Sequence, residues 1–414
     1  MKLRLKAPSN PTVDVIKIKI TGSKSESNRL LILQQQFFNL KINNLSNSDD
    51  TVHLQHALES NEDVLDIGHA GTAMRFLTAY LANQPDRNVT LTGSNRMKER
   101  PISILVDALR HLGAQIEYTG KEGYPPLRIT GKKLEGGEVT MDAAVSSQYL
   151  SALLLIGSQL TNGLQLNISG KLTSRPYLEM TTSLLTDIGL DVLFEETSIK
   201  IKPQKQIEDQ EITVESDWSS AGYWYSWVAL QEQGYSMELT SYKKISIQGD
   251  SGLARIYENL GVETVYGKGS ITLIKKKGFK QPTNLEFDLT EQPDQAQTIF
   301  ATCIGLGIDL QLTGLHTLRI KETDRIEAME VEGSRFRESE IVSTNNSISI
   351  QFKEDGIFNR KVAINTYNDH RMALAFAPLC MKTNLIINDA DVVTKSYGDY
   401  YNDLKAVKVD ITEI

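Results

Sequence analysis

The sequence predicts an α/β protein with two domains, each built from three copies of one repeated unit. The chain has 414 residues, which is too long for a single ordinary core, so two or more domains are expected. With 40% hydrophobic and 23% charged residues, it contains enough apolar material for sizeable cores. Segments that open with small, polar or basic residues and continue into an apolar run recur, from the second onward, roughly every 75 residues.

These recurring segments are predicted to be buried helices with functional N-termini. They begin near Ser25, Thr72, Ser147, Ser220, Gln295 and His370. Between them lies a β-like run that ends in glycine and is followed by an amphipathic helix. Residues 102–112 illustrate this second element, because their apolar positions follow helical spacing and Gly113 closes the helix. An alternating strand is predicted next, at residues 114–118.

The repeat therefore reads strand–helix–strand–helix–strand–strand (βαβαββ), about six times over, and six copies fit two domains of three. An ordinary α/β protein with coincidental spacing is the alternative. The most polar break near the middle of the chain, residues 231–234, is the candidate hinge.

Composition also bears on location and assembly. The longest apolar stretches, such as residues 150–156, are too short to span a membrane, and residues 1–6 lack the apolar run of a secretory signal. We therefore expect a cytoplasmic protein. Cys303 and Cys380 lie in apolar helical patterns without metal or redox spacing, so they are expected to be buried. No unusually apolar exposed helix stands out, which suggests a monomer.

Although the net charge is −8, the cations gather in small islands among glycines and hydroxyls. The islands are residues 22–29, 68–75, 96–101, 321–325 and 369–371. Glycine and serine let backbone N–H groups approach an anion, while Arg and Lys supply the counter-charge. This pattern suits small anionic metabolites better than a nucleic acid, which requires a continuous basic face.

The first islands have the character of anion sites at helix N-termini. Lys24 and Ser25 fall at a predicted strand-to-helix turn, with Arg29 one turn inside the helix, where free N–H groups and the helix dipole attract anions. In the second island, Gly71 leaves room for a ligand against the backbone. The spacing of a P-loop is absent, and a capped surface helix remains an alternative for the first island.

Two further segments in the first half of the chain carry groups suited to binding a ligand. Residues 96–101 hold three alternating cations, which need an anion or acidic partners unless they form a plain solvated cluster. Residues 146–148, Ser-Ser-Gln, offer two hydroxyls and an amide to a polyhydroxylated ligand, whereas N-capping would explain only one serine. Residues 174–177 are a weaker case, because Tyr177 fits core packing equally well.

The second half combines cations with carboxylates. Asp294 precedes a predicted helix and is either an N-cap or a catalytic carboxylate. Residues 321–325, Lys-Glu-Thr-Asp-Arg, fit one acid–base cluster, and residues 369–371 and Lys395 add further cations. Such a density of charge in a small concave site would perturb pKa values and allow proton exchange.

The chain resembles the 5-enolpyruvylshikimate-3-phosphate synthase family of enolpyruvyl transferases over essentially its whole length. The resemblance rests on collinear motifs at family-like spacing: GSKSxSNR, GxAGTAMR, RMKERP, SSQ, KETDR, NDHRM and the late Lys395. It implies the enolpyruvyl transferase fold, in which each domain is an inside-out α/β barrel of three βαβαββ units and the active site lies in the cleft between them. The first lobe would comprise residues 1–20 and 232–414, and the second would comprise residues 21–231.

The resemblance also implies an enzyme that transfers the enolpyruvyl group of phosphoenolpyruvate to the 5-hydroxyl of shikimate 3-phosphate. The reaction proceeds by addition and elimination, releases phosphate, serves chorismate and aromatic amino acid biosynthesis, and needs neither a metal nor an organic cofactor. Asp294 is expected to be the base, and Glu322 and Lys24 the acids. Shikimate 3-phosphate would meet Lys24, Ser25, Arg29, Ser146, Ser147, Gln148, Ser174, Tyr177, Asp294 and Lys321. Phosphoenolpyruvate would meet Lys24, Gly71, Arg96, Gln148, Arg325, Arg371 and Lys395.

Three positions depart from the family pattern. His69 stands where the family usually has Asn, which puts the geometry of the phosphoenolpyruvate loop in question. Thr317 occupies a position where some members have Asn, and Phe76 replaces a common Pro and is expected to pack inside. Gly71 is retained, so glyphosate is expected to compete with phosphoenolpyruvate.

Two other functions fit the sequence less well. The related transferase that acts on UDP-N-acetylglucosamine uses a Cys or Asp in a mobile loop, whereas neither cysteine of this chain lies in a polar loop. A non-catalytic, anion-binding paralogue would be expected to lose Lys24, Asp294 or Glu322, and all three are present.

Overall fold

The computed structural model describes residues 1–8, 15–142, 146–170, 175–353 and 356–414. The chain divides into two compact units, which are described one at a time. The first unit comprises Met1–Thr21 and Glu215–Ile414, and the second comprises Gly22–Val214.

The first crossing between the units lies beside the predicted one, but the second does not. It falls between Val214 and Glu215 rather than near residue 232. Directly after it, Glu215 is buried and accepts a hydrogen bond from Trp218 Nε1 at 2.8 Å. Helix α7 (Trp218–Ala229) then runs through the core of the first unit. The polar residues 231–234 therefore follow a buried helix and are not a hinge.

The first unit contains three four-stranded sheets. One has the order β20-β21-β1-β22, formed by Lys361–Ile364, Asn384–Ile387, Leu3–Lys6 and Asp410–Glu413. Another has the order β14-β15-β13-β2, formed by Val262–Tyr266, Ser270–Lys275, Ser236–Thr240 and Ile16–Ile18. The third has the order β16-β17-β19-β18, formed by Asn284–Asp288, Asp309–Thr313, Ile348–Phe352 and Ser339–Ser343.

The third sheet follows the predicted βαβαββ order without interruption. Its first two strands are parallel and joined through α9 (Ala296–Leu306), and its last two form an antiparallel pair after α10 (Arg325–Gly333). The N-terminal segment completes the other two sheets. β2 pairs in parallel with β13, and β1 lies between β21 and β22, where Leu5 faces Leu385 and Ile411.

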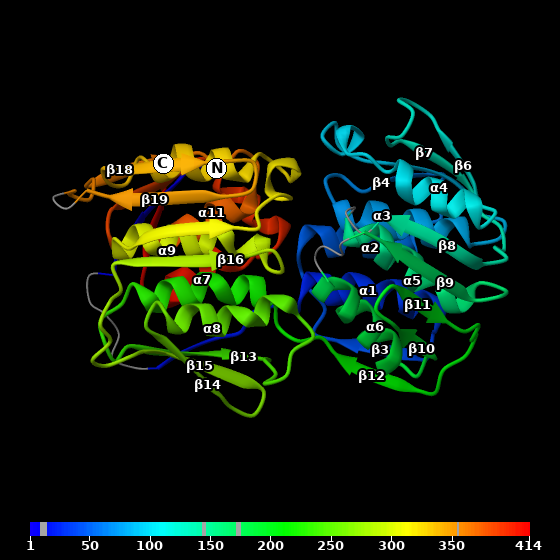
Figure 1. The fold of residues 1–414 in the computed structure, drawn as a ribbon, viewed down its shortest axis with the longest axis horizontal. Coiled ribbons are helices and arrows are strands. Elements are labelled where there is room, and N and C mark those ends of the chain that lie inside the picture. Colours follow the sequence, from blue (N-terminus) through cyan, green and yellow to red (C-terminus); the bar gives the residue numbers. More distant parts are fainter. Residues whose placement is uncertain (9–14, 143–145, 171–174, 354–355) are drawn as a thin grey trace. The chain divides into compact units, whose positions relative to one another are not determined.

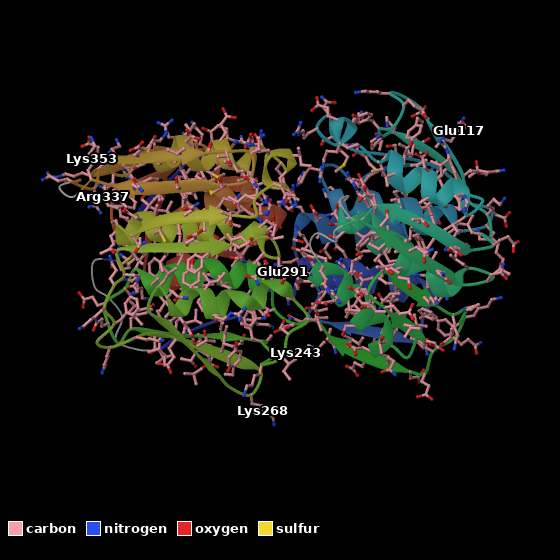
Figure 2. The ribbon with its side chains drawn as sticks, in the orientation of Figure 1. Glu117, Lys243, Lys268, Glu291, Arg337 and Lys353 are labelled. Atoms are coloured by element: carbon pink, nitrogen blue, oxygen red, sulfur yellow. The ribbon has the colours of Figure 1, made fainter. Side chains whose placement is uncertain are left out.

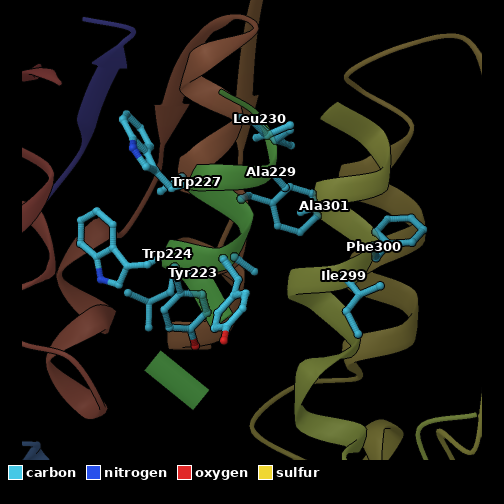
Figure 3. Close-up of a cluster of buried hydrophobic side chains, with 14 of the residues drawn as sticks. Tyr223, Trp224, Trp227, Ala229, Leu230, Ile299, Phe300 and Ala301 are labelled. Carbon is cyan, nitrogen blue, oxygen red and sulfur yellow. The ribbon is translucent and has the colours of Figure 1, made fainter. Parts of the chain in front are cut away.

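Three helices occupy the centre of the first unit, and the sheets lie outside them. α7, α9 and α11 (His370–Phe376) contact one another and are buried along almost their whole lengths. Figure 1 shows α7 and α9 running alongside each other between the strands β13–β15 and β18–β19. In Figure 3, Trp224 and Trp227 extend from the side of α7 that faces away from α9, and Phe300 extends from the side of α9 that faces away from α7, yet all three are buried in the core of the unit. A helix that is apolar all round is stable only in such a position.

The second unit repeats this arrangement with one reduced sheet. Its sheets have the orders β4-β5-β7-β6, β10-β11-β9-β8 and β12-β3. The strands are β3 (Leu40–Asn43), β4 (Val64–Asp66), β5 (Asn88–Thr92), β6 (Gln115–Tyr118), β7 (Leu127–Thr130), β8 (Gly137–Asp142), β9 (Leu164–Ser169), β10 (Val192–Phe194), β11 (Ser198–Ile201) and β12 (Gln210–Thr213). The central helices are α1 (Lys24–Gln36), α3 (Gly71–Ala82) and α5 (Ser147–Ile156), which contact one another.

Within the described residues, the third repeat of the second unit therefore contributes a smaller sheet than the other repeats do. The sheet that contains β3 and β12 has two strands, because the chain enters at Gly22 directly before α1 and leaves directly after β12.

The outer helices are α2 (Asp49–Glu59), α4 (Ser103–His111), α6 (Arg175–Asp187), α8 (Leu253–Glu258) and α12 (Tyr400–Ala406). The 3₁₀ turns are η1 (Met97–Glu99), η2 (Gly157–Gln159), η3 (Gly249–Gly252), η4 (Pro293–Gln295), η5 (Leu318–Ile320), η6 (Ala377–Met381) and η7 (Ala390–Lys395).

The predicted buried residues are confirmed. Cys303 and Cys380 are buried free thiols, and burial raises the pKa of Cys380 to about 12. Phe76 is 1% exposed. Charged side chains such as Lys268 and Lys353 of the first unit instead point outward (Figure 2). In the described parts of the chain, every helix is too short or too polar to cross a bilayer.

The N-terminal strand is predicted to be a main stabilising element of the first unit. Leu5 is fully buried, so Leu5→Ala is expected to lower the free energy of unfolding by about 3 kcal/mol through lost contacts and a residual cavity. Chemical denaturation measures this change. Lys2→Ala, at an exposed position before the strand, serves as the control, and equal effects of the two variants would contradict a structural role for β1.

Candidate active site

The cations of the first unit converge on Asp294, at the start of the central helix α9. Its Oδ1 lies 2.8 Å from Arg325 Nη1 and 3.5 Å from Lys321 Nζ. Its Oδ2 lies 3.2 Å from Arg371 Nη2, and its backbone carbonyl accepts a hydrogen bond from Arg371 Nη1 at 3.0 Å. Asp294 is therefore the centre of an ion-pair network, and it does not cap α9, whose N-cap position is Gln295.

Arg325 connects this network to two further carboxylates. Its Nη2 lies 2.8 Å from Glu322 Oε2, and its Nε lies 2.7 Å from Asp369 Oδ2. The other oxygen of Glu322 lies 2.6 Å from Lys395 Nζ. Burial acts to lower the pKa of Arg325, but the three adjacent carboxylates outweigh it and hold the pKa above its usual value. The guanidinium is therefore permanently charged.

Two N-caps fix the backbone beneath these side chains. Asp324 accepts hydrogen bonds from the N–H groups of Ile326 and Glu327, which starts α10 at Arg325. Asp369 accepts from the N–H of Arg371 at 2.9 Å and starts α11. Asp324 also pairs with Arg319 at 2.7 Å, so its role in the predicted acid–base cluster is structural.

The electrostatics of the network fix the charge state of Asp294. Burial acts to raise the pKa of this carboxyl, but Arg371 and the two other adjacent cations outweigh burial and hold the pKa well below its usual range. While these ion pairs are intact, Asp294 is therefore ionised and weakly basic. Any ligand anion that draws these cations away would raise its basicity.

In the second unit, Lys24 stands at the first position of α1, after the N-cap Ser23. Its Nζ lies 3.8 Å from Oδ2 of Asp50, whose side chain is buried. Ser25, the next residue, is partly exposed in the same first turn. The start of α1 thus presents an ammonium and a hydroxyl beside free backbone N–H groups, as an anion site requires.

Arg29 lies behind this turn and is 2% exposed. It donates hydrogen bonds to Thr181 Oγ1 at 2.7 Å, to Ser151 Oγ at 3.1 Å and to the carbonyls of Ser25 and Tyr177. Burial lowers its pKa to about 10. The structure thus shows Arg29 tying α1 to α5 and α6, with the Tyr177 ring 5.9 Å away.

At the start of α3, Gly71 leaves space that another side chain occupies. A Cβ at this position would lie 2.5 Å from Arg100 Nη1. The buried Arg75 holds the surrounding loop by donating to the carbonyls of Gly71 and Pro101, each at 3.2 Å. Arg96, by contrast, is 54% exposed and pairs with Glu99 at 3.0 Å. The cation of this loop that lies beside Gly71 is Arg100.

The Ser-Ser-Gln triplet lies at the start of α5 and joins α3. Ser146 is the N-cap and accepts a hydrogen bond from the N–H of Gln148, while Ser147 is buried. Gln148 Nε2 donates to Thr72 Oγ1 at 3.3 Å, which places the beginnings of α3 and α5 together. Ser174 lies outside the described residues.

A family model described as EPSP synthase (3-phosphoshikimate 1-carboxyvinyltransferase) matches residues 36–404. The chain belongs to this family. A 3-phosphoshikimate 1-carboxyvinyltransferase of Bacteroides fragilis is 44% identical over 409 residues, which cover 98% of this chain and 97% of the relative. One of Haemophilus influenzae is 33% identical, with 94% and 96% covered.

Solved structures agree on the fold. An EPSP synthase of Acinetobacter baumannii superposes with a TM-score of 0.77 at 22% identity over 100% of both chains. The enolpyruvyl transferase NikO of Streptomyces tendae gives a TM-score of 0.72 at 13% identity, covering 99% of this chain and 98% of that one. The predicted enolpyruvyl transferase fold is therefore confirmed.

The positions that depart from the EPSP synthase pattern lie close to the site residues of their own units. His69 is half-exposed, with Nε2 4.0 Å from Asp49 Oδ2 and its ring edge-on to His53. Thr317 caps η5, the turn that precedes Lys321. Among the residues that the structure describes, no cluster of three or more His, Cys, Asp or Glu could hold a metal ion.

Sequence reasoning missed several residues that the structure places in the clusters. They are Asp50, Ser219, Asp250 and Gln295, whereas Arg100 was placed in an island but in neither binding set. The sequence carried a signal for Asp250, because it directly follows a predicted β-run that ends in glycine, as residues 94–101 do, although residues 245–248 form no strand in the structure. Asp369 was recognised within an island, but its pairing with Arg325 was not.

The depressed pKa of Asp294 predicts a pH-dependent contribution to stability. Because its folded-state pKa lies below the unfolded value of about 3.9, the stabilisation is complete above about pH 4 and is lost as the pH falls further. Asp294→Asn is expected to lower the free energy of unfolding at neutral pH by about 3 kcal/mol.

Denaturation of wild type and Asp294→Asn between about pH 6 and pH 3 measures this effect, and the difference between them should shrink below about pH 4. Glu117→Gln, at an exposed carboxylate of the second unit, is the control (Figure 2). A difference that stays constant with pH would show that Asp294 titrates normally.

Proposed function

We propose that this protein transfers the enolpyruvyl group of phosphoenolpyruvate to the 5-hydroxyl of shikimate 3-phosphate, releasing phosphate. The name of its relatives, 3-phosphoshikimate 1-carboxyvinyltransferase, describes this reaction. The observation that carries the proposal is the cluster around Asp294, where Lys321, Arg325 and Arg371 surround one carboxylate at the start of a central helix.

The cluster supplies the groups that the chemistry needs. In the addition step, the 5-hydroxyl oxygen bonds to C2 of phosphoenolpyruvate, loses its proton to a base, and the methylene carbon C3 gains a proton. In the elimination step, phosphate leaves C2 and a proton leaves C3, which restores the double bond. We assign Asp294 as the base and Glu322 and Lys24 as the acids. The cations stabilise the charge of the tetrahedral intermediate.

Substrate binding would itself activate Asp294. In the ligand-free protein, its ion pairs hold its pKa too low for efficient proton abstraction. The carboxylate and phosphate groups of the two substrates would compete for Arg371 and Lys321 and weaken their hold on Asp294. Its basicity would then rise only when both substrates are in place.

We also propose which residues bind each of the two substrates. Shikimate 3-phosphate would meet the starts of α1 and α5 together with Lys321, and phosphoenolpyruvate would meet Gly71, Gln148, Arg325, Arg371 and Lys395. Arg29 would act by holding the start of α1, because its own donors are bonded to the protein. We place Arg100 beside the predicted Arg96 as a candidate cation for phosphoenolpyruvate.

In this proposal the residue sets of both units serve one reaction. The chemistry uses side chains alone, and we expect the chain to work as a monomer in the cytoplasm. The transferase that acts on UDP-N-acetylglucosamine is the less favoured alternative, because both cysteines are buried in the first unit, in α9 and η6, and are not available as loop residues.

The assigned roles predict that Lys24→Met and Asp294→Ala each lower turnover by about a thousandfold or more, because each removes a proton-transfer group. Phosphate release in the presence of both substrates measures turnover. Lys41→Met, at an exposed lysine of the second unit, is the control and should retain activity. Circular dichroism checks that the variants are folded, and a near-normal rate in either one would remove that residue from the mechanism.

Glyphosate is predicted to compete with phosphoenolpyruvate and not with shikimate 3-phosphate. It is a small anion that would use the same cations, and Gly71 preserves the space beside Arg100 that a side chain would fill. Initial rates at several glyphosate concentrations should show a rising apparent KM for phosphoenolpyruvate at constant maximal rate. Activity that is unchanged by a large excess of glyphosate would contradict this expectation.

A further inference from the structure

A buried carboxylate outside the assigned site lies directly behind it. Asp250, in η3, is 8% exposed and belongs to neither of the two predicted binding sets. Its Oδ2 accepts hydrogen bonds from the hydroxyl of Ser219 and from Gln295 Nε2, the latter at 3.0 Å. A buried ionised group costs free energy unless it is paired and hydrogen-bonded, so its retention here calls for a reason.

Each hydrogen-bond partner of Asp250 is connected to a residue that we assign to the reaction. Arg371 Nη2 donates to Ser219 Oγ at 3.4 Å and lies 3.2 Å from Asp294 Oδ2. Gln295 is the residue after Asp294 in the turn η4 and is fully buried. Asp250 thus contacts Ser219, which bonds to the proposed substrate-binding cation Arg371. It also contacts Gln295, the residue next to the proposed base Asp294.

We propose that Asp250 is a positioning residue for this site, which holds Arg371 through Ser219 and holds the turn that carries Asp294 through Gln295. The inference rests on the proposed function and adds to it a set of residues that touch no substrate. Ser219 is the intermediary, since its hydroxyl donates to Asp250 and accepts from Arg371.

The direction of the hydrogen bonds supports this role. A serine hydroxyl has one donor and two acceptor positions, and its proton rotates to suit its partners. The carboxylate of Asp250 fixes that proton on its own side, so a lone pair of Ser219 faces the guanidinium. Arg371 also partly compensates the burial of Asp250, because it acts to lower a pKa that burial raises. The two charges therefore support each other.

A glycine in α7 provides independent support. Gly222 follows Ser219 by three residues and lies on the same face of the helix. A Cβ at Gly222 would lie 2.6 Å from Gln295 Oε1. The first turn of α7 therefore supplies both the hydroxyl that reaches Arg371 and the space that admits Gln295. One face of α7 therefore contacts both Arg371 and Gln295, as expected if these contacts together position the site residues.

The test measures KM for each substrate separately. Asp250→Asn and Ser219→Ala are each expected to raise the KM for phosphoenolpyruvate about tenfold, as the loss of one charge-assisted contact would. In Ser219→Ala, which leaves the contact between Asp250 and Gln295 intact, the KM for shikimate 3-phosphate should change less than about twofold. Ser219→Thr keeps the hydroxyl and should behave like wild type. Ser251→Ala removes a hydroxyl from the same turn as Asp250 and is the matched control.

The double variant Asp250→Asn/Ser219→Ala distinguishes positioning from a general loss of packing. If both residues act on Arg371 through one chain of contacts, the double variant should be no worse than the more damaging single variant. Additive losses in the double variant, or a KM for phosphoenolpyruvate in Ser219→Ala that is unchanged or rises no more than the KM for shikimate 3-phosphate, would each overturn the proposal. Ser219→Ala keeps the test valid if Asp250→Asn does not fold.

A binding readout separates this inference from the proposed function. The shift in melting temperature caused by phosphoenolpyruvate is measured for wild type and for each variant. If wild type binds phosphoenolpyruvate but releases no phosphate with shikimate 3-phosphate, the proposed function fails, and a smaller shift in Ser219→Ala and Asp250→Asn still supports positioning. Equal shifts in all proteins, or none in wild type, would refute it.

Discussion

The interaction on which the site of the first unit depends is the sharing of the buried Arg325 guanidinium among three carboxylates. Asp294, Glu322 and Asp369 belong to three different segments, and one planar cation with five donors holds them all. Removal of any one partner would leave buried charge uncompensated, so the arrangement is strongly determined. The starts of α9, α10 and α11 are fixed to one another as a result.

The same network gives the site of the first unit a particular electrostatic state. The cations around Asp294 are not free charges that await an anion, because carboxylates already occupy them. Substrate anions must displace part of these pairs, which couples binding to the basicity of Asp294. In the second unit, Arg29 and Arg75 donate instead to hydroxyl and carbonyl oxygens, and burial lowers the pKa of each to about 10. Their charge adds to that of the helix N-termini of their own unit.

The sequence did not predict which way a side chain points or which distant segments pack together. The loop at residues 96–101 contains alternating cations, but no periodicity in a short 3₁₀ turn tells which of them faces Gly71, and the structure places Arg100 there. The polar residues 231–234 gave the signal of a hinge, yet the aromatic helix before them is buried with the first unit. The role of Asp250 depends on its contacts with Ser219 and Gln295, which are distant in the sequence.

The sequence by itself determined the βαβαββ repeat, the apolar central helices, the buried cysteines and the family, because each depends on local patterns or collinear motifs. Only the tertiary structure decided that β1 lies between β21 and β22, that Arg325 binds three carboxylates, and that Arg371 meets Asp294 across 77 residues of chain. Such contacts arise from the packing of helix starts against one another, which local sequence does not encode. Desolvation and pairing of charge then select which of the many polar residues share a site.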